Sequence, residues 1–431
     1  MRTRSQRCLA LAQLANSVGD GAFYTTSALY FTRVAGLSAA WVGLGLTLAW
    51  AAGSLVGVPL GRLADRRGPR GTSVLLALAT SAAVGSFLVV RGDFAAFVVA
   101  ACAYTSAQSG LAASRQSLLA RLVPAGERTG LLARLQSTLN GGLAVGAALG
   151  GLALGVGTPA AYRGALALDA VCFLGCALLL LRLPRVAPAQ AVPAPDAAGA
   201  ARPGVLRDRP YVLVAALNAV LMLRLPLLSL VLPLWITERT GAPAWLASGL
   251  FVLNTLAVTL FQVRSARSVT GQGSAVRALR LSGLVMLACC AVFALSAGRS
   301  AGPAAVALVL GAVLQVVAEM QQSAGAWQLS FDLAPADRIG EYQGFFGTGT
   351  TVARTLGPLA LTTLLLDWGT PGWLLLGALM AAAAYAIGPA TRLAARRDTA
   401  EVPAAGPPGA EAPAAGPGPA AAVRPQPAPA G

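Results

Sequence analysis

The chain contains no histidine and no lysine, and only 11% of its 431 residues are charged. Its six cysteines lie within apolar runs and include no Cys-x-x-Cys pair, so the residues offer no metal site. The sequence also lacks a phosphate-binding glycine-rich loop, and no loop gathers a cluster of catalytic groups. These absences disfavour an enzyme, and we expect neither a metal nor a cofactor.

Apolar residues, by contrast, make up 56% of the chain, and the mean hydropathy is +0.67. A helix needs about 20 residues to cross a bilayer core about 30 Å thick, because each residue rises about 1.5 Å. The sequence therefore predicts an all-α integral membrane protein with twelve transmembrane helices. The runs of suitable length form two sets of six, near 8–31, 38–60, 72–90, 94–116, 129–156 and 161–182, and near 210–235, 244–263, 278–297, 303–327, 340–366 and 372–391.

A Pro/Ala-rich stretch separates the two sets, and an Ala/Pro/Gly-rich segment follows the second. Neither composition can pack a core. We therefore predict an N-terminal six-helix bundle (1–183), a cytoplasmic linker (184–209), a C-terminal six-helix bundle (210–393) and a disordered cytoplasmic tail (394–431). A short echo between the halves, Leu122-Val-Pro-Ala and Leu333-Ala-Pro-Ala, supports this division. Two related halves with substrate bound between them near the midplane are a common transporter design.

The arginines predict the orientation of these helices. If the first helix starts in the cytoplasm, each outward loop holds at most one arginine, whereas the inward segments hold clusters. This bias places both termini in the cytoplasm and predicts a multi-pass protein of the plasma membrane. The net charge of +16 then belongs at the membrane surface and not on nucleic acid. Arginine in place of every lysine, with abundant Ala, Gly and Pro, indicates a GC-rich bacterial genome, and we expect a monomer.

The loop after the second predicted helix carries a recognisable pattern, Gly61-Arg-Leu-Ala-Asp-Arg-Arg-Gly-Pro-Arg70. It resembles the signature loop of the major facilitator superfamily, Gly-x-Leu-Ala-Asp-Arg-x-Gly-Arg-Arg, and occupies the same place between helices two and three. The resemblance implies the major facilitator fold, two pseudo-symmetric six-helix bundles. It also implies that Asp65 and Arg66 dock near the start of helix eleven and latch an outward-open state. The signature positions are Gly61, Asp65, Arg66, Gly68 and Arg70; the alternative is a basic loop that only sets topology.

A glycine stripe marks the fifth predicted helix. It resembles the antiporter motif Gly-xxx-Gly-Pro-xx-Gly-Gly of the superfamily's exporters, with Ala147 in place of the proline. The resemblance implies an interface with helix eight that restricts leak, and ordinary glycine packing is the alternative. Asn16-x-x-Gly19-Asp20 and Asp169-Ala-Val-Cys-Phe173 add to a likeness to drug, macrolide and siderophore exporters, which are drug:proton antiporters. The stripe consists of Gly142, Gly146, Gly150 and Gly151.

Four ionisable residues lie near the middle of predicted helices, where each costs about 2.5–3.5 kcal/mol to insert. They are Asp20, Arg224, Glu319 and Arg354. The family resemblance places helices one, four, seven and ten around the cavity. Asp20 and Glu319 are therefore candidates for proton coupling, and the alternative is structural pairing of Asp20 with Arg354 and of Glu319 with Arg224.

Polar neighbours strengthen two of these positions. Asn16, Asp20 and Tyr24 share one helical face, and Gln315, Glu319 and Gln322 share another. Such faces suit a wet cavity better than lipid. Asp169, nearer the end of the sixth helix, is expected to form hydrogen bonds between helices.

The sequence thus predicts a secondary transporter that exports a small amphipathic molecule, such as a drug, an antibiotic or a siderophore, by proton antiport through alternating access. Its expected partners are that substrate, protons and the lipid bilayer, with no nucleic acid. Two alternatives stay open: a nutrient or metabolite importer of the same superfamily, and a membrane scaffold or sensor that transports nothing.

Overall fold

The computed structural model describes residues 4–186 and 204–400, and every regular element within them is a helix. Residues 187–203 of the predicted linker and 401–431 of the predicted tail lie outside the described residues. The N-terminal half consists of α1 (Arg4–Leu29) with its π-helical continuation η1 (Tyr30–Val34), α2 (Ala39–Arg67), α3 (Pro69–Phe87), α4 (Phe94–Leu122), α5 (Ala125–Val156) and α6 (Pro159–Leu181).

The C-terminal half also makes six passes, although its first pass is broken. Pro226 lies at the break, and a proline has no N–H to continue the helical hydrogen bonds. The half begins with η2 (Val205–Arg207) and α7 (Arg209–Leu221), which continues through η3 (Met222–Arg224) and η4 (Leu227–Val231) into α8 (Leu232–Arg239). It goes on with α9 (Trp245–Ala266), α10 (Gln272–Ala294), α11 (Ala301–Asp332), α12 (Ile339–Thr362) with η5 (Thr363–Asp367), and α13 (Thr370–Ala400).

The predicted fold class is confirmed: the chain is an all-α membrane protein with twelve passes in two six-helix halves. Eight of the described helices are long and apolar enough to cross a membrane by length and composition alone. Two boundaries differ from the sequence-based prediction. Helix α13 runs to Ala400, past the predicted end of the bundle at 393. The last residues of the predicted linker form η2, in which Val205 is fully buried.

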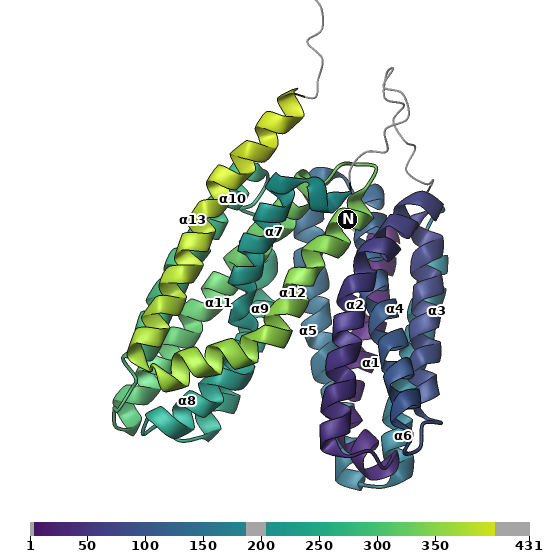
Figure 1. The fold of residues 1–431 in the computed structure, drawn as a ribbon, viewed down its shortest axis with the longest axis horizontal. Coiled ribbons are helices and arrows are strands. Elements are labelled where there is room, and N and C mark those ends of the chain that lie inside the picture. The colour runs from purple at the N-terminus through teal and green to yellow at the C-terminus, as the bar shows by residue number, and fades with distance from the viewer. Residues whose placement is uncertain (1–3, 187–203, 401–431) are drawn as a thin grey trace, which may run out of the picture.

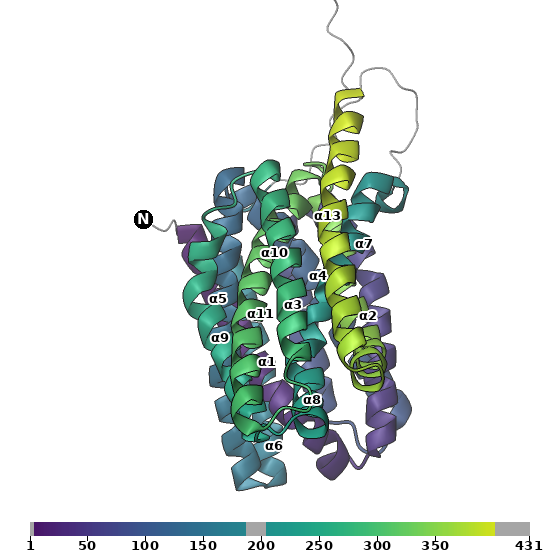
Figure 2. The same cartoon turned by 90° about the vertical axis from the view of Figure 1, so that its left-hand side faces the viewer.

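Each half has its own hydrophobic core. In the N-terminal half, Phe31 packs edge-on against Phe87 and Phe97, with ring centroids 5.0 and 4.7 Å away. In the C-terminal half, Trp235 packs against Trp373 at 5.5 Å. Figure 1 shows the two halves side by side, and Figure 2 views them with the C-terminal half in front. Helices α2 and α5 of the first half contact α12 and α9 of the second. A few residues cross between the two cores: Ala133 packs with the C-terminal core, and Phe331 and Ile339 pack with the N-terminal one.

The glycine stripe of α5 faces α1 and not the eighth pass. A Cβ on Gly146 would collide with the backbone oxygen of Val18, and one on Gly142 would lie 2.6 Å from Ser17 Cβ. Gly150 lies against Ala22 and Thr25, whereas Gly151 meets nothing. Helix α5 does contact α9, the eighth pass. At Gly142, Gly146 and Gly150, however, the nearest atoms belong to α1. The expected glycine interface with helix eight is therefore wrong: the stripe tightens packing inside the N-terminal half.

Candidate functional site

The arginine-rich end of the protein, where α2 meets α3 and α12 begins, joins the two halves. Asp65 lies there, buried near the end of α2. Its Oδ1 accepts the N–H of Gly340 at 3.0 Å, and its Oδ2 accepts the N–H of Glu341 at 3.0 Å. Both N–H groups belong to the first turn of α12, where a helix lacks internal acceptors and carries partial positive charge. Ser117 of α4 donates a further bond to Asp65 Oδ1 at 2.7 Å.

A second acid, Glu341, gathers the groups around this contact. Arg62 of α2 pairs with its Oε1 at 2.7 Å, and Arg338 pairs with its Oε2 at 2.6 Å. The N–H of Val205 also donates to Oε1, at 2.9 Å. Arg66, which the resemblance implied would dock together with Asp65 near the start of the eleventh pass, is exposed. Arg62, unlike Arg66, reaches across the two halves to Glu341.

Three other signature positions, Gly61, Gly68 and Arg70, fix how α2 packs and turns at this end of the protein. A Cβ on Gly61 would collide with the backbone of Gly340, so α2 and α12 approach as closely as glycine permits. Gly68 joins α2 to α3 with φ +98°, a conformation that favours glycine. Arg70 donates to the backbone oxygens of Leu180 and Leu181 at the end of α6. Asp65, Glu341, Gly61 and Gly340 together form what we call the junction.

The first mid-helix carboxylate, Asp20, is held by neutral donors. Asn16 donates to its Oδ2 at 2.7 Å, and Gln108 donates to its Oδ1 at 2.9 Å. The hydroxyl of Tyr104 lies 3.4 Å from Oδ1 and accepts a bond from Gln108 at 2.8 Å. Asp20 forms no ion pair within residues 4–186 and 204–400, so the expected alternative of a pair with Arg354 is not formed.

Asp20 lines a cavity of about 320 Å³. Asn16 and Tyr24 line it from the same helix, as their shared face predicts, and Arg354 lines it from α12. Arg115 of α4 also contributes, and it donates to Gln13. Leucines of α4 and α5 and the ring of Trp327 supply the apolar part of the wall. The wall is thus apolar with a few amides and charges, which is the usual make-up of a small-molecule site.

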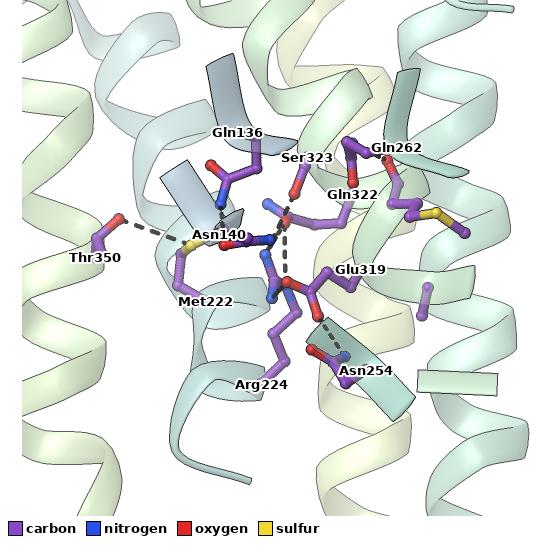
Figure 3. Close-up of polar contacts among 12 residues, drawn as sticks. Gln136, Asn140, Met222, Arg224, Asn254, Gln262, Glu319, Gln322, Ser323 and Thr350 are labelled. Atoms are coloured by element: carbon purple, nitrogen blue, oxygen red, sulfur yellow. Dashed lines mark hydrogen bonds and ion pairs between the residues drawn. The ribbon is translucent and has the colours of Figure 1, made fainter. Parts of the chain in front are cut away.

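The second mid-helix carboxylate, Glu319, is in an ion pair (Figure 3). Its Oε1 lies 2.9 Å from Nη1 of Arg224, and its Oε2 accepts a bond from Asn254 at 3.0 Å. Arg224 also donates to Gln322 Oε1, at 3.2 and 3.1 Å, and to Ser323 at 3.3 Å. This cluster belongs wholly to the C-terminal half and does not line the Asp20 cavity.

The two glutamines predicted to share a face with Glu319 differ in their surroundings. Gln322 belongs to the cluster and donates to Asn218 at 2.7 Å. Gln315 is buried as well, but its carbonyl oxygen has no partner within the described chain. Figure 3 also draws Gln136 and Asn140 of α5, where the amide of Gln136 donates to Asn140 at 3.3 Å.

Sequence reasoning missed Glu341, Ser117 and Asn254. The sequence does mark Glu341, because it is an acid in the first turn of α12, just after the repeated Leu-x-Pro-Ala pattern. It also marks Asn254, which is an amide within the apolar run that forms α9. It does not mark Ser117, since serine is common in all these helices.

Comparison with known proteins agrees with this architecture. The fold is that of a secondary transporter with two six-helix halves. A family model of the Major Facilitator Superfamily matches residues 9–358, and the chain belongs to that superfamily. Among curated proteins, none matches the sequence.

Several solved structures share the fold at low identity. A bacterial homologue of the iron transporter ferroportin, in an outward-facing state, is 18% identical with a TM-score of 0.70, over 92% of this chain and 100% of that one. The human organic anion transporter MFSD10 is 15% identical with a TM-score of 0.67, over 90% and 100%. FucP in the outward conformation is 14% identical with a TM-score of 0.65, over 91% and 99%. At these identities the likeness shows the fold alone.

Proposed function

We propose that this transporter exports a small amphipathic molecule, drug-like, antibiotic or siderophore-like, in exchange for protons. The observation that carries the proposal is the state of Asp20. It faces a cavity, sits on the wall with amides and an arginine nearby, and has no cation bound to it. A carboxylate held only by neutral donors can gain or lose a proton without breaking an ion pair.

The junction supplies the second requirement, a contact that can alternate. In alternating access the two halves rock about a central site, so bonds at one end must break when that end opens. Asp65 and Arg62 belong to one half, and their partners in α12 belong to the other. We propose that these bonds hold the arginine-rich, predicted cytoplasmic end shut while the cavity faces outward.

Inverted membrane vesicles test the coupling. An imposed proton gradient should drive uptake of a fluorescent amphipathic dye, and Asp20→Asn should abolish uphill uptake. Asp367→Asn removes an exposed acid at the end of η5 and serves as the matched control, with uptake expected to stay unchanged. Uptake that is indifferent to the gradient, or that survives Asp20→Asn, would exclude proton antiport at this residue.

A comparison of inverted with right-side-out vesicles decides the direction of transport. A nutrient importer of this superfamily would accumulate its substrate in right-side-out vesicles under a gradient of the opposite sense. An antiporter shows the reverse, because proton entry then drives substrate exit. A screen across compound classes, including sugars and organic anions, separates the two.

A further inference from the structure

Asp169 of α6 is fully buried inside the N-terminal half, with 0% of its surface exposed. Neither of its carboxyl oxygens has a hydrogen-bond partner within the described chain. The sequence-based expectation that Asp169 bonds to a neighbouring helix is therefore wrong. Buried polar groups are nearly always hydrogen-bonded, and an exception at a mid-membrane position points to a role in the protein's work.

The position of this carboxyl is set by a glycine. Asp169 Oδ1 packs directly on Gly19 of α1, where a Cβ would collide with it and would lie 2.9 Å from Cys172 Cβ. Gly19 precedes Asp20 in the chain. Asp169 therefore contacts α1 one residue before Asp20, and it is not among the residues that line the cavity.

The surroundings favour an uncharged acid. The titratable groups that act on Asp169, or on which it acts, are Asp20 and Tyr24 of α1, Tyr104 of α4 and Cys172 of its own helix. None of these four is a base. An ionised carboxylate without a partner is far costlier to bury than a neutral acid, and a nearby negative charge on Asp20 adds repulsion.

The remaining helices that pack on α6 do not change this picture. Helix α3 presents Ser81, whose hydroxyl donates to the backbone oxygen of Ala170. Helix α5 has no ionisable residue between Arg134 and Val156, and η1 offers only Arg33, which is exposed, and the buried Tyr30. Water in the cavity reaches Asp20, which is 8% exposed, before it can reach Asp169.

We infer that Asp169 is a second proton-binding site, which holds a proton near Asp20 and exchanges it through Asp20. The two carboxyls form no hydrogen bond with each other, so in this step a water molecule that enters between them from the cavity accepts the proton of Asp169 and gives one to the carboxylate of Asp20. The pair keeps a single negative charge, now on Asp169. Release of the proton from Asp20 to cavity water would leave both carboxylates charged, so reprotonation of one of them follows. The inference rests on the proposed proton coupling and extends it from one carboxyl to two.

Infrared spectroscopy of the full chain in lipid tests the site without any substrate. The wild type should show a carbonyl stretch at the high frequency of a carboxylic acid that has no hydrogen bond. Asp169→Asn should remove this band, Asp20→Asn should keep it, and Asp169→Glu should move it. Absence of the band in the wild type, or its persistence in Asp169→Asn, overturns the inference.

Proton counting gives the second readout. After a jump from alkaline to acidic pH, the Asp169→Asn protein should take up one proton fewer than the wild type, as should Asp20→Asn. The matched control is Cys172→Ala, on the same helix and beside the same glycine, which should take up as many protons as the wild type. Equal uptake by Asp169→Asn and the wild type means that Asp169 only fills space, and it overturns the inference.

Transport distinguishes this inference from the function on which it rests. If wild-type transport ignores the proton gradient, antiport fails, while the infrared band still reports the proton on Asp169. If antiport holds, Asp169→Asn should shift the pH profile of transport and Asp169→Glu should restore it. A wild-type pH profile in a well-folded Asp169→Asn protein overturns the inference and leaves antiport standing.

Discussion

Each half carries one of the two carboxylates that the sequence predicts for proton coupling, and the surroundings of the two differ. Glu319 is joined to Arg224 at 2.9 Å and to Asn254, so its charge is already balanced. Asp20 is bonded only to an amide of its own helix and to an amide and a phenol of α4. Depth in the bilayer is therefore a poor guide to which carboxylate changes its protonation state. The presence or absence of a cationic partner is the better one.

This contrast changes the assignment of the two acids. Asp20 and Glu319 are equal candidates for coupling in the sequence. In the structure, removing the proton-binding capacity of Asp20 breaks no ion pair, whereas any change at Glu319 leaves Arg224 buried without its counter-charge. We therefore propose Asp20 as the coupling residue and the Glu319 cluster as a structural element of the C-terminal half.

The largest effect is expected when only one partner of the Glu319–Arg224 ion pair is removed. Arg224→Ala should destabilise the protein by about 3–5 kcal/mol, because it leaves the carboxylate of Glu319 largely buried and unpaired. Thermal unfolding of the purified protein measures this loss. Arg224→Met combined with Glu319→Gln is the control, since it removes both charges together and should recover most of the stability. An equal loss of stability in the single and the double variant would mean that packing of these side chains, and not their charge, stabilises the cluster.

The second-largest effect is expected at the junction. Asp65→Asn keeps the shape of the side chain but replaces one acceptor oxygen by a donor NH2, so one of the two bonds to α12 is lost and the other loses its charge, where each is worth about 1.5–3 kcal/mol when one partner is charged. The population should shift toward forms open at the arginine-rich end. Spin labels on α2 and α12 read this as longer distances between the halves. Distances that stay unchanged would show that other contacts, such as Thr129 with Gln328, hold this end by themselves.

A smaller effect is expected at the glycine stripe. Gly146→Ala introduces a Cβ against the backbone of Val18 and should cost about 1–3 kcal/mol of stability through forced separation of α1 and α5. Gly151→Ala provides the control, because that position is open. Thermal unfolding separates the two variants. If the stripe were an interface with α9 instead, the two glycines would differ in leak of protons and not in stability.

The smallest effect belongs to Arg66. Because its side chain is exposed, Arg66→Ala should change stability by less than about 0.5 kcal/mol. Arg62→Ala, its neighbour in the same signature, should shift the opening of the junction in the direction of Asp65→Asn, since Arg62 pairs with Glu341 across the halves. Spin-label distances measured in parallel compare the two. A larger effect of Arg66→Ala than of Arg62→Ala would contradict the contacts described above.

Hydropathy predicted the twelve passes because each pass is a local property of about 20 residues. The signature loop predicted the place of Asp65 because it lies at a helix boundary that sequence can locate. Partners of side chains were harder. The choice of Arg62 over Arg66, the side of α5 that its glycines face and the isolation of Asp169 all depend on helix rotation and on helices far apart in the chain. A periodicity of 3.6 residues indicates that a face exists but not what it meets.

The hydrogen bond from Val205 to Glu341 has one more consequence. The connection between the halves is anchored on the same carboxylate that Arg62 reaches. Arg62 also packs on Gly204, the residue before Val205. Opening the junction would take Arg62 away from both Glu341 and Gly204 and would uncover this segment, so that a protease that cuts near Val205 could distinguish the shut form from the open one.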